Sequence, residues 1–98
     1  MNVEQFKASL SNESPPADLT DALRALWYDA TGHWEFAHEL AQAQDDANSA
    51  WVHAYLHRKE GDLANAHYWY RRAGKPNATV PLDREWEAIV AALLTHDA

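Results

Sequence analysis

The chain has 98 residues, of which 47% are hydrophobic, contains no cysteine, and carries a formal net charge of −7 at pH 7. This length predicts one domain, 1–98, and the lack of thiols excludes disulfides, thiolate metal ligands and cysteine nucleophiles. The negative charge opposes binding to nucleic acid and to anionic membranes, so neither is expected as a partner, and the polar residues within segment 1–10 argue against a secretion signal and predict a cytoplasmic protein.

A short helix is expected at the N-terminus, because Asn2 has the side chain of a helix cap and is followed by apolar residues at helical spacing. Those apolar residues are Val3, Phe6 and Leu10. Residues 11–16 have the composition of a linker, so segment 1–14 is predicted to be a short helix followed by a linker. The prolines predict that the next helix begins between Pro15 and Asp18.

Two helical hairpins, 15–44 and 45–74, are predicted next. In each one a glycine ends the first helix and the second helix follows almost at once, which forces the two helices to be antiparallel. Five positions of the first hairpin match positions 29 residues later, and they pair Gly32 with Gly61, Trp34 with Leu63, Ala37 with Ala66, His38 with His67, and Leu40 with Trp69. A last helix, 81–97, has one apolar face and is expected to cover the end of the stack.

The turns within the hairpins carry a family resemblance. Segments 32–37 (GHWEFA) and 61–66 (GDLANA) both place a glycine, a cap, a large residue and an alanine in the same order. Over residues 17–74 the chain resembles tetratricopeptide-repeat proteins. This resemblance implies an all-α fold, a right-handed solenoid of two repeats with a C-terminal capping helix. The signature WVHAYLHRKEGD, followed by YWYRRAG, is also similar to a group of short, uncharacterised bacterial proteins and implies no activity.

Histidine spacing in the second hairpin predicts a metal site. His53, His57 and Glu60 follow the pattern His-x-x-x-His-x-x-Glu, which places them within an arc of about 60° on a helix and offers two imidazoles to one zinc ion. Candidates for a further ligand are His33, His38 and His67. Ala54 follows His53, so the His-Glu-x-x-His motif of metalloproteases is absent. The alternative is that these histidines pack inside the repeats, which the equivalence of His38 and His67 favours for that pair.

Residues 58–84 hold six of the eight basic residues and predict a partner-binding surface. In the resembling family the first helix of each repeat lines a groove, where aromatic rings would grip apolar side chains and Arg58 and Lys59 would bind a carboxylate. The predicted partner-binding residues are Trp51, Tyr55, Arg58, Lys59, Tyr68, Arg71 and Arg72. The alternative for Trp51 and Tyr55 is a place in the core.

No segment carries a catalytic or cofactor-binding signature, since the chain has neither a Gly-x-Ser-x-Gly elbow nor a glycine-rich phosphate loop. We therefore expect a non-enzymatic interaction module that presents its helical groove to a protein or peptide partner, to an acidic partner in particular, or to a second copy of the chain. The alternative is a zinc-binding hydrolase or small-molecule enzyme that uses His53, His57 and Glu60. A third option is a structural subunit that oligomerises through its tryptophans.

Overall fold

The computed structural model describes residues 1–95, which form α-helices and one short 3-10 segment. The elements are α1 (Val3–Ala8), η1 (Ser9–Ser11), α2 (Asp21–Ala30), α3 (Trp34–Gln42), α4 (Ala47–Glu60), α5 (Leu63–Ala73) and α6 (Leu82–Thr95). The predicted all-α class is confirmed for this part of the chain, and the last two residues of the expected helix 81–97 lie outside it. No helix within residues 1–95 has the length and apolar character needed to cross a membrane.

Most helix ends follow from capping residues that the sequence displays. The Asn2 side chain accepts a hydrogen bond from the backbone N–H of Gln5 at 2.8 Å, and the Gln5 side chain accepts one from the backbone N–H of Asn2. The side chains of Asp46 and Asp62 cap α4 and α5 by accepting a hydrogen bond from the backbone N–H of Ser49 and of Asn65. Gly61 ends α4 with a φ of 93°, a left-handed conformation that favours glycine.

Helix α2 begins later than predicted, at Asp21 rather than between Pro15 and Asp18. Its cap is Thr20, whose side chain accepts a hydrogen bond from the backbone N–H of Leu23 at 3.3 Å. Asp18 has a φ of 66°, which a right-handed helix does not allow. Residues 15–20 are therefore a connecting loop, and the two prolines lie within it rather than opening the helix.

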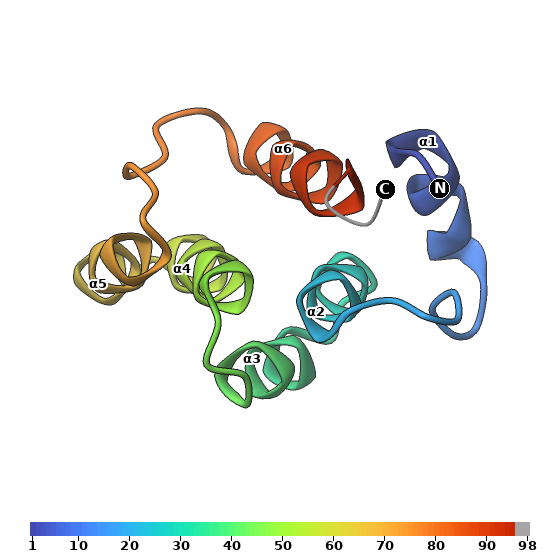
Figure 1. The fold of residues 1–98 in the computed structure, drawn as a ribbon, viewed down its shortest axis with the longest axis horizontal. Coiled ribbons are helices and arrows are strands. Elements are labelled where there is room, and N and C mark those ends of the chain that lie inside the picture. The colour runs from blue at the N-terminus through green and yellow to red at the C-terminus, as the bar shows by residue number, and fades with distance from the viewer. Residues whose placement is uncertain (96–98) are drawn as a thin grey trace.

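The helices form two hairpins that are covered on one side by the last helix. α2 contacts α3, α4 contacts α5, and α3 and α4 join the two hairpins. Figure 1 shows α6 packed on α2 and α4 from the side opposite α3, with α1 beside α6. The face of α4 that looks away from α3 is therefore occupied by the chain's own C-terminal helix.

One large core lies between α1, α2, α3, α4 and α6, and a smaller one lies between α4 and α5. Fully buried members of the large core include Phe6, Leu23, Leu26, Val52, Leu56, Ile89 and Val90. Buried tryptophans satisfy their indole N–H groups: Trp27 donates to the Ser9 hydroxyl at 3.2 Å, and Trp86 donates to a backbone carbonyl of α2 at 3.1 Å. This core fixes α4, and α4 carries two of the histidines described next.

Candidate metal site

Helix α4 presents two buried imidazoles one turn apart. His53 and His57 are 4% and 8% exposed, and their rings are stacked with centroids 4.7 Å apart. The spacing of four residues puts both on the side of α4 that meets α3. The sequence had indicated this pair, and the structure places both side chains together.

The third imidazole comes from α3. The Nε2 atom of His38 lies 2.9 Å from the Nε2 atom of His53, and the ring centroids of His38 and His57 are 5.0 Å apart. His38, His53 and His57 can each offer one nitrogen such that all three nitrogens lie within 4.8 Å of one another. Three imidazole nitrogens bound to one tetrahedral zinc ion at 2.0–2.1 Å would be about 3.3 Å apart. The nitrogens of this cluster would therefore have to approach one another by at most about 1.5 Å to hold such an ion.

Glu60 has a different place from the one expected. Its Oε2 atom accepts a hydrogen bond from Nδ1 of His57 at 2.8 Å, and it is not part of the three-residue ligand group. A carboxylate on the far nitrogen of a metal-binding histidine fixes the ring and its tautomer and raises its basicity. Glu60 thus leaves Nε2 of His57 as the nitrogen with a free lone pair, while His38 takes the place expected for Glu60.

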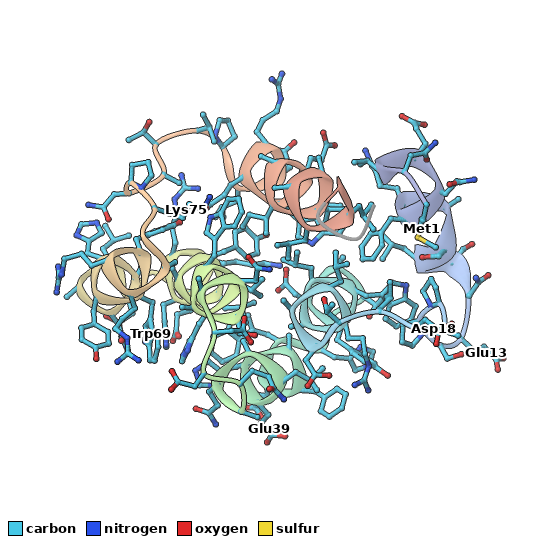
Figure 2. All side chains as sticks on the ribbon, in the orientation of Figure 1. Met1, Glu13, Asp18, Glu39, Trp69 and Lys75 are labelled. Carbon is cyan, nitrogen blue, oxygen red and sulfur yellow. The ribbon has the colours of Figure 1, made fainter. Side chains whose placement is uncertain are left out.

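Two tryptophans pack against His38, His53 and His57. These three histidines are called the histidine cluster below. The Trp34 ring is stacked on His38 with centroids 5.1 Å apart, and the Trp69 ring is stacked on His53 at 4.0 Å. Figure 2 shows Trp69 reaching from α5 toward the region between α4 and α3. The Trp34 indole N–H donates to the Leu56 carbonyl at 3.1 Å, so this ring is held in position by a hydrogen bond.

Burial disfavours the charged form of two of the three histidines. Burial, and then the nearby imidazoles of His38 and His57, lower the pKa of His53 to about 4. Burial and then His57 also lower the pKa of His38, against the opposing effect of the carboxylates Glu60 and Glu39. At neutral pH His38 and His53 are therefore neutral imidazoles, the form that binds a metal ion.

One nitrogen of the cluster has no partner. The Nδ1 atom of His53 is buried and makes no hydrogen bond with any described residue. A buried polar atom left in this state costs roughly 1–3 kcal/mol. Since Nε2 of His53 faces Nε2 of His38, Nδ1 lies on the other side of the ring, where a hydrogen-bond partner would offset this cost.

The other two candidate ligands lie elsewhere. His33 and His67 are both exposed, and neither belongs to the ligand group. His33 contacts the Thr31 hydroxyl through Nδ1 at 3.2 Å. The positions of His38 and His67 match in the repeat, but only His38 has a following hairpin to face, because α6 packs on α2 and α4 instead of continuing the stack beyond α5.

The residues expected to line a groove on α4 are largely engaged within the chain. Tyr55 is 3% exposed and lies in the core, which was the alternative to partner binding for this residue. Arg58 donates to Glu85 at 2.8 Å and also to the Val80 carbonyl, and Lys59 forms an ion pair with Asp29. Trp51 is half-buried, with the Lys75 ammonium 4.2 Å from its ring centre. Among these side chains Arg58 bonds to α6 itself, through Glu85, and so holds α6 against this face of α4.

The predicted partner-binding residues of α5 lie on the surface. Tyr68 is 42% exposed, and Arg71 and Arg72 are exposed beside it. Both guanidinium carbons lie 5.9 Å from the Tyr68 ring centre, and Arg72 also donates to the Tyr68 hydroxyl at 3.1 Å. This group leaves an aromatic and cationic surface on the outer face of α5.

His38 belongs to the cluster, and the sequence named it only as one of three candidates for a further ligand. Its signal was present, because it lies one helical turn after Trp34 in the hairpin that precedes His53 and His57. Spacing along one helix cannot reveal which residues of a neighbouring helix meet it.

In comparisons with known proteins, no family model, no curated protein and no solved structure matched the chain.

Proposed function

We propose that the protein binds a divalent transition-metal ion, zinc in the first instance, through His38, His53 and His57. The observation that carries the proposal is the convergence of three imidazole nitrogens within 4.8 Å of one another, from two helices, with two of the three side chains buried. Imidazole ligands suit zinc, copper and nickel. The ion would bind the folded state and not the unfolded state, because His38 of α3 meets His53 and His57 of α4 only after folding.

The test is thermal unfolding of metal-free protein with and without zinc. A ligand at a hundredfold excess over its Kd stabilises the folded state by about 2.7 kcal/mol, which for a domain of this size raises Tm by about 10 °C or more. His38→Ala, His53→Ala and His57→Ala should each abolish the rise. His67→Ala is the matched control, because His67 occupies the equivalent repeat position, is exposed, and should leave the rise unchanged. A zinc-dependent rise that survives all three cluster substitutions would contradict the proposal.

A second candidate function, partner binding, is supported by the outer face of α5. Exposed arginines around an aromatic ring are a frequent composition of interface hot spots. The positive charge of this surface complements an acidic partner, and the acidic remainder of the chain makes a second copy such a partner. Light scattering over a range of concentrations would reveal self-association that Arg71→Glu with Arg72→Glu weakens. A strictly monomeric protein at all concentrations would leave only a different partner for this surface.

The finer family expectations also belong to this proposal. A tetratricopeptide-like right-handed arrangement of the two hairpins, with α6 as a covering helix, is supported by the 29-residue repetition and by Ala37 and Ala66, which match in the repeat and are both 0% exposed. A cytoplasmic location, expected from the polar residues within segment 1–10, is tested by cell fractionation.

A further inference from the structure

The metal ion proposed above needs more ligands than the cluster provides, and the inference below rests on that proposed metal binding. The ligand group within the described residues contains three histidines and no carboxylate. Zinc takes four ligands, and a site with three protein ligands keeps its fourth position for water or an added ligand. We infer that the fourth position at His38, His53 and His57 is exchangeable and accepts water or a small monodentate anion.

The nearest acidic candidate is already engaged. The Oε2 atom of Glu60 holds Nδ1 of His57 at 2.8 Å, which is the far side of that imidazole from the nitrogen offered to the metal. Moving Glu60 onto the ion would break this hydrogen bond and release the His57 ring. His33 and His67 are exposed and outside the group, so neither supplies the fourth ligand in this arrangement.

Charge favours an anion over a neutral ligand. Three neutral imidazoles leave the +2 charge of the ion uncompensated within the ligand set, in a region where two of the ligands are at least nine-tenths buried. Trp34 and Trp69, stacked on the imidazoles, contribute apolar faces, and the Trp34 indole N–H is committed to Leu56. The Trp34 N–H is therefore not available to an oxyanion, and a small anion that binds the ion through one atom fits best between these apolar faces.

Cobalt(II) provides the test, because its visible absorption reports its own coordination. Metal-free protein is loaded with one equivalent of cobalt(II), and sodium azide is titrated in. The expected result is a saturable change of the spectrum that fits one azide per cobalt ion. The same response is expected of His67→Ala, which leaves the cluster intact.

The variant Glu60→Gln separates the two origins of the fourth ligand. If the position is open, the wild type and Glu60→Gln both respond to azide. A spectrum that stays unchanged in the wild type but responds in Glu60→Gln would show that Glu60 fills the position and would overturn the inference, as would cobalt-loaded protein that responds in neither form. Failure to bind cobalt(II) or zinc at all is a different outcome, since it removes the metal site and this inference together.

Discussion

At the scale of single residues, the cluster is set by neighbours that come from three different helices. His53 has His38 of α3 on one nitrogen, His57 one turn along α4, and the Trp69 ring of α5 against its face. The burial that results excludes water from His53 and makes its protonation unfavourable. The same burial thus holds the ring in place and keeps it neutral, the form in which one ring nitrogen carries a lone pair.

Acidification of metal-free protein should reveal the lowered pKa of His53 as a loss of stability. The pKa of His53 is about 4 in the folded chain and near 6.5 when the chain is unfolded, so the unfolded state binds the proton first as the pH falls. The stability contributed by neutral His53 is complete above pH ~6.5 and is lost between pH ~6.5 and pH ~4, by up to roughly 3 kcal/mol. Urea denaturation across this range, compared with His53→Phe, measures the loss. Equal pH dependence in the two proteins would contradict the assignment.

Removing the charge of Glu60 should weaken metal binding without removing a ligand. The carboxylate orients His57 and increases its basicity, and such partners are worth about 10–100-fold in metal affinity. We expect Glu60→Gln to raise the zinc Kd by at least ~10-fold in competition with a chromophoric chelator. Glu35→Gln is the control, because Glu35 is exposed on α3 and should leave the Kd unchanged.

At the scale of elements, helix α6 is attached to the second hairpin by a buried carboxylate. Glu85 is 4% exposed, accepts a hydrogen bond from the Arg58 guanidinium at 2.8 Å, and accepts another from the Tyr70 hydroxyl. Burial, and then the hydrogen bond and charge of Glu85, raise the pKa of Tyr70 far above its usual range. One side chain of α6 thereby joins α4 and α5 at once.

Truncation of this carboxylate should destabilise the fold. Glu85→Ala leaves the largely buried Arg58 guanidinium and the Tyr70 hydroxyl without their partner, and we expect a loss of about 3 kcal/mol in the free energy of unfolding. Glu87→Ala is the control, because its ion pair with Lys7 is about half exposed and contributes roughly 1 kcal/mol or less. Urea unfolding curves for the two variants measure the difference, and equal losses would contradict the structural role of Glu85.

Helix boundaries followed from the sequence where one side chain determines them. Asn2, Asp46 and Asp62 cap helices by local hydrogen bonds, so their roles depend only on adjacent residues. The start of α2 was misplaced because the cap is Thr20, and nothing in the composition of the preceding loop distinguishes it from an earlier start. The site was half predictable for the same reason: His53 and His57 share one helix, whereas their meeting with His38 depends on how two hairpins pack.

At the scale of the whole molecule, the two ends of the fold support each other. Phe6 of α1 is 0% exposed and lies against Trp86 of α6, with ring centroids 5.7 Å apart. Both helices belong to the large core, together with α2 and α4. The first and last helices therefore belong to one packed unit.

Loss of the contact between Phe6 and Trp86 should destabilise the whole fold. Phe6→Ala removes a fully buried ring and is expected to lower the free energy of unfolding by about 3–4 kcal/mol. Amide hydrogen exchange would show whether the loss is global, in which case α1 and α6 lose protection together. Loss of protection in α1 alone would mean that this helix opens independently of the rest.

The face of α4 expected to receive a partner is covered by α6, and this arrangement limits how the architecture can grow by gene duplication. Because α6 packs on α2 and α4, a duplicated hairpin has no free surface on that side of these helices. The uncovered face belongs to α5, so a new hairpin would have to be spliced between Gly74 and Pro81. Its first helix would then lie against His67 as α4 lies against His38, and the longer chain would already carry one of the three imidazoles of a second cluster.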